Sequence, residues 1–243
     1  MSKTEKRVRL FFVITCEIFT LFSAVKVLAT QDYKHLPICL VTFVLILLPE
    51  IVGAFFSCRI NTGFYTVCVL YAIGPMLGDC YRLYYLTDFW DTILHCLGGI
   101  VFFMFGVYIY ELLSSDQSKI LACAVFALCF SIALAGIWEF VEFGCDRAFG
   151  TDMQQDTVIS ELNSYHLGEK MGYVGSIRDI ESVIVNGQEL NLGGYLDTGL
   201  IDTMTDMLIE SAGALIAAVI YYLDKGRHPV FTRKVRDNRK EFI

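Results

Sequence analysis

The sequence predicts an all-α, polytopic membrane protein: a bundle of six transmembrane helices with one long extracytoplasmic loop. The chain of 243 residues is 55% hydrophobic, whereas soluble domains are about 45–50% apolar. Charged residues make up 19% of the chain and the mean hydropathy is +0.54. Long apolar runs alternate with short polar joints, which is the pattern of helices that each cross a bilayer.

Six apolar segments have a length near the ~20 residues that cross a hydrocarbon core. They are expected at about 10–29, 36–57, 64–79, 90–113, 120–145 and 198–223, within a single membrane domain, 1–243. The first segment follows a basic stretch, as a signal peptide would. Its apolar run is too long for a typical signal peptide and Glu17 interrupts it, so we expect an uncleaved helix. Gly74-Pro75 predicts a kink in the third segment.

The basic residues indicate the orientation. An even number of spans places both termini on one side, and both termini are rich in Lys and Arg. Because basic flanks stay in the cytoplasm, we expect cytoplasmic termini in a bacterial plasma (inner) membrane. The basic tail at 225–240 is expected to touch anionic lipid, and nothing in the charge pattern indicates nucleic acid. The lipid bilayer is therefore the expected partner, and the oligomeric state stays open.

The long connection, about 147–197, is extracytoplasmic in this orientation. Residues 156–166 are expected to form a short helix. Residues 182–192 carry an Asn-Gly pair between two short apolar runs, which is typical of a β-hairpin with a type I′ turn.

The chain has nine cysteines and no closely spaced pair of the kind that binds metals. Most lie in apolar runs, where cysteine behaves as a small hydrophobic residue. Cys80 and Cys145 lie near the outer ends of two spans, so a disulfide between them is one alternative.

Acidic residues and one histidine recur at helical spacing in the apolar segments. The pairs are Asp91 and His95, Glu139 and Glu142, and Asp202 and Asp206. Residues three or four apart share one face of a helix, and all three pairs lie toward the outer ends of the fourth to sixth spans. Burying a carboxylate in a bilayer costs about 2.5–3.5 kcal/mol on insertion scales. A chain that buries several carboxylates at the same depth therefore indicates a functional site.

One histidine with several carboxylates from bundle helices is a ligand set for one or two divalent metal ions. Oxygen-rich sets suit Mg or Mn, and an added imidazole admits Zn or Fe. We therefore take all six residues as candidate metal ligands. One of the glutamates is a candidate general base, and a metal near the outer leaflet can polarise a phosphoryl or carbonyl oxygen. Whether the protein is an enzyme stays open.

The same residues also have structural explanations. Asp91 and Asp202 begin their helices, where acids cap free N–H groups and favour the helix dipole. Asp79 ends the third span, where the interface is wet. Gly98 and Gly99 follow His95 on nearly the same side, so a neighbouring helix can approach closely there.

Two other functions fit the pattern. A cation or proton transporter would need a polar route from the outer acids through Glu210, Glu17 and Glu50 to the cytoplasm. A non-catalytic envelope protein would bind a partner through the long loop, and its polar cluster would only hold the helices together.

Three motifs carry a resemblance to a known family. They are Trp90-Asp91-Thr-x-Leu-His95-x-x-Gly98-Gly99, Trp138-Glu139-x-x-Glu142-Phe143, and Asp202-Thr-x-x-Asp206-Met207 with Gly213-Ala214. In this order and spacing they resemble the uncharacterised bacterial integral-membrane family of the YjdF type, from about the third span to the sixth. More distantly, the chain is similar to VanZ-like membrane proteins, which are linked to cell-envelope biology. These resemblances imply a membrane site that faces the envelope, and they imply no particular reaction. Our leading hypothesis is that the site binds a divalent cation and acts on a lipid or lipid-linked envelope substrate.

Overall fold

The computed structural model describes residues 3–55, 58–87, 89–114, 119–224 and 231–233. Within these residues, six helices are long and apolar enough to cross a membrane. They are α1 (Lys3–Ala29), α2 (Leu36–Phe55), α3 (Thr62–Cys80), α5 (Trp90–Leu113), α6 (Ile120–Phe149) and α7 (Leu200–Asp224). The predicted all-α, six-span class is confirmed. The expected end of the second span at residue 57 and most of the basic tail lie outside the described residues.

The chain forms two compact units. The first consists of Met1–Leu134 and Ile209–Ile243, and the second of Ala135–Leu208. The helices α6 and α7 each continue from one unit into the other. We describe each unit separately.

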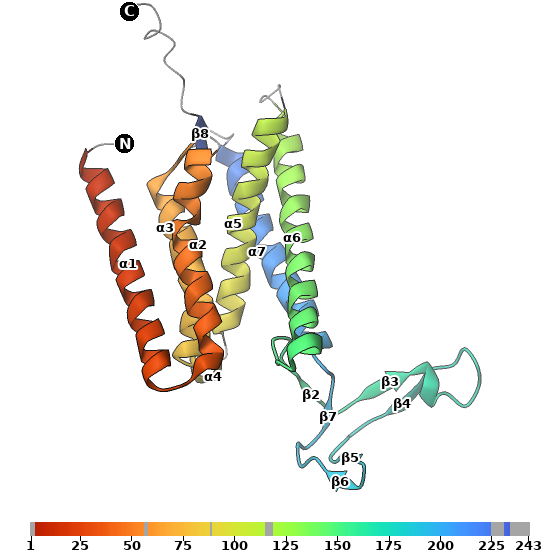
Figure 1. Cartoon of the computed structure of the whole chain (residues 1–243). Helices are drawn as coiled ribbons and strands as arrows, with labels where there is room; N and C mark the ends of the chain where they lie inside the picture. Colours follow the sequence, from red (N-terminus) through yellow and green to blue (C-terminus); the bar gives the residue numbers. More distant parts are fainter. Residues whose placement is uncertain (1–2, 56–57, 88, 115–118, 225–230, 234–243) are drawn as a thin grey trace, which may run out of the picture. The chain divides into compact units, whose positions relative to one another are not determined.

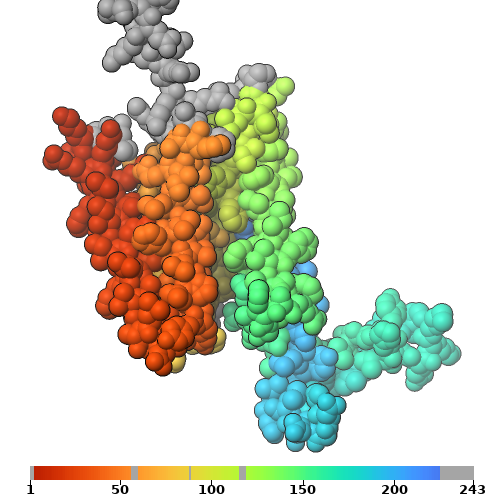
Figure 2. Space-filling model, in the orientation of Figure 1, coloured from red at the N-terminus to blue at the C-terminus, as the bar shows by residue number. Residues whose placement is uncertain are grey.

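In the first unit, α1, α2 and α3 pack against one another, and α5 packs on α3 (Figure 1). The space-filling view shows α1 and α2 side by side (Figure 2). Short connections force these neighbours to run antiparallel: the 3₁₀ turn η1 (Tyr33–His35) joins α1 to α2, and β1 (Cys58–Ile60) lies between α2 and α3. Their shared core includes Ile46, Tyr65 and Met76, which are fully buried.

The beginning of α1 and the strand after α7 lie together on one side of the first unit. The strand β8 (Phe231–Arg233), which follows α7, pairs antiparallel with β1. At the beginning of α1, Arg9 Nη1 donates a hydrogen bond of 3.2 Å to the Ile60 carbonyl of the same strand β1. The two described ends of the chain therefore lie at the same end of this unit, as an even number of spans requires (Figure 1).

The other end of the first unit joins α3 to α5. The chain leaves α3, passes through the single-turn helix α4 (Leu83–Leu86) and enters α5 at Trp90. Trp90 Nε1 donates a hydrogen bond of 3.1 Å to the Gly74 carbonyl of α3. Gly74 also makes room for Leu94, since an added Cβ would collide with that side chain. The first turns of α5 are thereby fixed against α3.

In the second unit, the connection between α6 and α7 carries three short antiparallel pairs. They are β2 (Val158–Ile159) with β7 (Tyr195–Leu196), β3 (Leu162–Ser164) with β4 (Gly175–Ile177), and β5 (Ile184–Val185) with β6 (Gln188–Glu189). The predicted hairpin is confirmed as β5–β6. Its turn residues Asn186 and Gly187 have φ values of 52° and 82°, the two positive values that a type I′ turn requires.

The helix predicted for 156–166 is wrong. These residues form β2 and β3, followed by the 3₁₀ turn η2 (Tyr165–Leu167). The backbone groups of β2 and β3 pair with β7 and β4, which lie far along the chain, so local N-cap signals do not decide the conformation. The β-branched pair Val158 and Ile159 also favours an extended backbone.

Candidate metal centre

His95 lies between two carboxylates in the first unit. Its Nε2 is 3.7 Å from Asp91 Oδ2, one turn earlier on α5, and its Nδ1 is 3.6 Å from Glu210 Oε2 on α7. Both distances exceed the ~2.7–3.2 Å of a hydrogen bond. The side chains of His95 and Glu210 are only 8% and 4% exposed. We call Asp91, His95 and Glu210 the imidazole cluster.

Glycines let α5 and α7 approach closely enough to form this cluster. A Cβ added at Gly99 would collide with the backbone carbonyl of Glu210, and one added at Gly213 would collide with that of Cys96. Because backbone atoms cannot move aside as side chains do, any larger residue would separate the helices. The predicted close approach is therefore confirmed at Gly99, whereas Gly98 faces α3.

Asp206 lies one turn before Glu210 on the continuous helix α7 and is buried. It belongs to the second unit, whereas Asp91, His95 and Glu210 belong to the first. Sequence reasoning included Asp206 among the ligands but left Glu210 out. The signal for Glu210 was its spacing of four residues from Asp206, which continues the same stripe of the helix.

Glu139 and Glu142 lie in the second unit, and both are buried. The indole Nε1 of Trp138 donates a hydrogen bond of 2.8 Å to Glu142 Oε1, one turn further along α6. This bond orients the carboxylate of Glu142. Burying two acids one turn apart on an apolar helix is costly, which keeps both as candidate ligands.

Asp202, in the first turn of α7, binds the backbone of the connection between α6 and α7. Its Oδ2 accepts a hydrogen bond of 2.9 Å from the backbone N–H of Gln155. The acid that precedes the helix is Asp197, which accepts from the N–H groups of Ile201 at 2.7 Å and Thr157 at 2.8 Å. Burial opposes ionisation of Asp197, but these hydrogen bonds outweigh it and lower the pKa of the carboxyl group. Capping at this end of α7 is thus assigned to Asp197.

Asp79 has a partner of its own, which the sequence did not indicate. His35 Nε2 lies 3.2 Å from Asp79 Oδ1, and His35 Nδ1 lies 2.8 Å from Asp32 Oδ2. His35 therefore ties the α1–α2 connection to the end of α3. Nothing in the helical spacing shows this contact, because His35 lies in a 3₁₀ turn outside the apolar runs.

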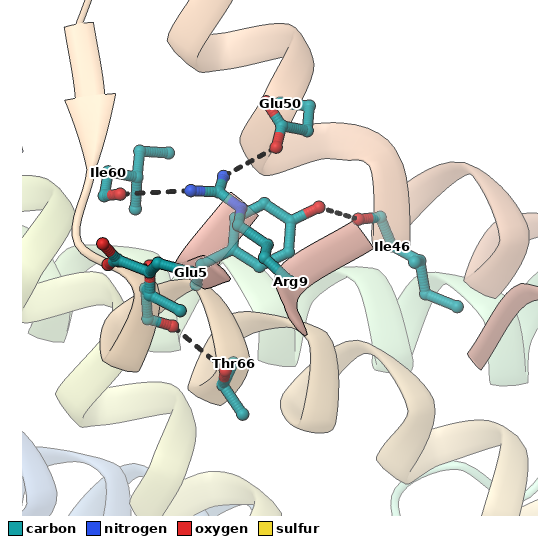
Figure 3. Close-up of polar contacts among 8 residues, drawn as sticks. Glu5, Arg9, Ile46, Glu50, Ile60 and Thr66 are labelled. Carbon is teal, nitrogen blue, oxygen red and sulfur yellow. Dashed lines mark hydrogen bonds and ion pairs between the residues drawn. The ribbon is translucent and has the colours of Figure 1, made fainter. Parts of the chain in front are cut away.

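A second buried polar group lies at the end of the first unit where β1 pairs with β8. Figure 3 shows the Arg9 guanidinium between the Glu50 carboxylate and the Ile60 carbonyl. The Arg9–Glu50 ion pair measures 2.9 Å, and the guanidinium carbon lies 3.5 Å from the centre of the Tyr65 ring. We call Arg9, Glu50 and Tyr65 the arginine cluster.

A comparison with protein-family models identifies the family of this chain. A family model described as "Predicted membrane protein (DUF2238)" matches residues 9–227. The chain belongs to this family. The matched range contains Arg9, Glu50 and the whole imidazole cluster. No curated protein and no solved structure matches the chain.

In this DUF2238 protein, the imidazole cluster holds more acid than its single imidazole can balance. Asp91 and Glu210 flank His95 directly, and Glu210 Oε1 is buried with no hydrogen-bond partner among the described residues. Carboxylates gathered in a low dielectric cannot all ionise unless protons or a cation compensate them. The arrangement can therefore hold a divalent cation or share protons.

Proposed function

We propose that this protein is a plasma-membrane protein of a bacterial envelope that holds a divalent cation at an outward-facing site. There it would act on a lipid or lipid-linked envelope substrate. The observation that carries the proposal is the buried His95 imidazole with a carboxylate at each ring nitrogen. The similarity to the YjdF type and, more distantly, to VanZ-like proteins supports the envelope as its place of action.

The two nitrogens of His95 would have different roles, because one ion can bind only one of them. Two ligand atoms with bonds of about 2.1 Å to a tetrahedral ion lie roughly 3.4 Å apart. The 3.7 Å between Nε2 and Asp91 Oδ2 is close to that separation. Glu210 would then accept a hydrogen bond from Nδ1–H and orient the ring, as a carboxylate commonly does for a metal-bound histidine.

We assign Asp91 and His95 of the first unit as the central ligands, and we keep Asp206 of the second unit as a candidate ligand. Glu139, Glu142 and Asp202 complete the proposed set. A mixed set of imidazole and carboxylates favours Zn or Fe over Mg or Mn. When bound, the ion would supply Lewis-acid chemistry at a phosphoryl or carbonyl oxygen. Glu139 or Glu142 would serve as general base.

The arrangement of the first unit supports the proposed orientation. Both described ends of the chain lie beside β1, and α1 begins with the basic residues Lys3, Lys6 and Arg7. Placing this end in the cytoplasm satisfies the positive-inside rule. The imidazole cluster begins at the opposite end, at the first turns of α5, and would then face outward. All six spans would belong to one membrane domain.

Metal analysis of the purified protein tests the proposal. We expect stoichiometric Zn or Fe in the wild type and its loss in His95→Ala and Asp206→Asn. The matched control is His35→Ala, which removes another imidazole placed between two carboxylates and should leave the metal content unchanged. A wild type that contains no metal, and is not stabilised by added Zn or Fe, would contradict the proposal.

A proton or cation transporter is the alternative function, and Glu17 is the observation that favours it. Both carboxylate oxygens of Glu17 are buried in α1 with no hydrogen-bond partner among the described residues. Against it, the buried residues of α5 between the cluster and Val107 are apolar, among them Val101 and Phe103, and only then does Tyr108 bring a buried hydroxyl group. Ion flux in proteoliposomes that disappears in Glu17→Gln would establish transport instead of a metal site.

A further inference from the structure

Two cysteines of the first unit face each other. Cys39 Sγ and Cys80 Sγ are 3.7 Å apart, and both are free thiols. The contact follows from the fold: α2 and α3 run antiparallel, Cys39 lies in the first turn of α2, and Cys80 is the last residue of α3. The sequence pointed instead to Cys145 as a partner of Cys80, because Cys39 lies in an apolar run.

The neighbouring residues hold this end of the three helices together without a covalent bond. Tyr81, next to Cys80, stacks on Phe19 and shares a hydrogen bond of 2.9 Å with Ser23, both on α1. Asp79, on the other side of Cys80, pairs with His35. The two sulfurs are therefore held in contact, and forming a disulfide would require side-chain rotation to bring them from 3.7 Å to ~2.05 Å.

We propose that Cys39 and Cys80 form a disulfide that links α2 to α3 at the extracytoplasmic end of the bundle. This inference rests on the orientation given under the proposed function. In that orientation the thiols lie opposite the chain termini, on the oxidising side of the membrane, where disulfides form and persist. The linked end of α3 also receives the Trp90 hydrogen bond on Gly74, so the disulfide would restrain the helix on which the imidazole cluster begins.

The oxidant would be the disulfide of an extracytoplasmic thiol oxidoreductase. Cys80 is partly exposed, whereas Cys39 is 1% exposed, so Cys80 would react first. Its thiol loses a proton and attacks one sulfur of the oxidant, forming a mixed disulfide and releasing one oxidant thiolate, which takes up a proton. Cys39 then loses its proton and attacks the Cys80 sulfur, releasing the second thiolate. Two cysteine thiols are oxidised and one oxidant disulfide is reduced to two thiols.

The test is thiol trapping in cells that express the full chain. Free thiols are blocked with N-ethylmaleimide in acid-quenched cells, the protein is reduced, and newly freed thiols are labelled with a polyethylene-glycol maleimide. We expect a two-label gel shift in the wild type and none in Cys39→Ala or Cys80→Ala. Cys123→Ala, which removes a buried thiol elsewhere in the same unit, should keep the full shift. A wild type with no shift, even after cells are treated with a membrane-impermeant oxidant, would overturn the inference.

A second measurement separates this inference from the proposed orientation. Tyr33→Cys, in a background without Cys39 and Cys80, places an exposed thiol in the α1–α2 connection at the same end. Labelling of this thiol by an impermeant maleimide in intact cells supports the orientation. Its absence overturns both the orientation and the disulfide in cells. The metal content of the purified protein does not depend on orientation, so the metal site is tested separately.

Discussion

The first unit has a buried charged or titratable group near each of its ends, and the two groups differ in the partners that surround them. In the arginine cluster, Arg9 has a counter-charge in Glu50, a carbonyl acceptor in Ile60 and an aromatic face in Tyr65. In the imidazole cluster, His95 has a carboxylate at each nitrogen, at distances too long for hydrogen bonds. One cluster contains its own cation, and the other has an excess of acid.

We interpret this difference as one between a structural use of charge and the functional use that we propose. The Arg9 guanidinium has an ion pair, a hydrogen bond and a ring contact within the chain, although its buried Nε has no hydrogen-bond partner among the described residues. Surplus carboxylates around a buried imidazole destabilise the fold unless something neutralises them. Under the proposed function, a bound cation would supply the missing positive charge. The comparison predicts opposite responses when one carboxylate is removed from each cluster.

The largest effect is expected from Glu50→Gln. The substitution leaves the buried Arg9 guanidinium without its counter-charge, and breaking a buried pair in this way costs about 3–5 kcal/mol. Because Glu50 is 60% exposed, water can partly replace it, and we expect a loss below that range, about 1.5–3 kcal/mol. The free energy of unfolding, measured by titration with sodium dodecyl sulfate in detergent micelles, gives the change.

The matched substitution in the other cluster is Glu210→Gln. It removes a surplus charge, so the metal-free protein should keep its stability or gain some. Metal affinity should fall by about 10–100-fold, as it does when the carboxylate behind a ligating histidine is lost. If Glu210→Gln destabilised the metal-free protein as much as Glu50→Gln does, the two clusters would be equivalent and the functional interpretation would be wrong.

A smaller effect is expected at the glycine contact that builds the imidazole cluster. In Gly99→Ala the added methyl group collides with the Glu210 carbonyl, and overpacking of this kind costs roughly 1–3 kcal/mol. Metal affinity should fall with stability, because Glu210 moves away from His95. Gly144→Ala on α6 is the control: its added Cβ meets nothing within 4 Å, so stability should be unchanged or slightly higher. Equal stability of both variants would exclude a close backbone contact at Gly99.

Sequence patterns gave the features that depend on local spacing. Apolar run length indicated six long helices, and the Asn186-Gly187 pair gave the β5–β6 turn, since both signals lie within a few residues. Helical spacing found His95 with Asp91, because one turn of α5 carries both. The helix expected at 156–166 failed because its backbone pairs with strands far along the chain.

Contacts between distant residues were beyond the reach of the same patterns. The pairing of His35 with Asp79 and the contact of Cys39 with Cys80 each join segments more than a helix apart in sequence. Arg9 was counted with the basic N-terminus, although in the fold it is buried beneath Glu50 and Tyr65. A periodic pattern shows which face of a helix is polar. Only the packed structure shows which segment of the chain that face contacts.

The smallest effect concerns Asp197, an acid of the second unit that is fully satisfied. Its pKa is lowered in the folded protein, so its hydrogen bonds to Ile201 and Thr157 contribute stability above its unfolded pKa of about 3.9. That contribution is lost as the pH falls through the folded pKa.

We expect hydrogen exchange at both amides to be protected at pH 6 and to lose protection in acid, beyond the intrinsic pH dependence of exchange. Asp197→Ala should cost about 1 kcal/mol at neutral pH, as loss of a helix cap does. Asp197→Asn should show no acid transition at these amides. A transition that persists in Asp197→Asn would assign it to another acid and remove Asp197 as the satisfied counterpart of the imidazole cluster.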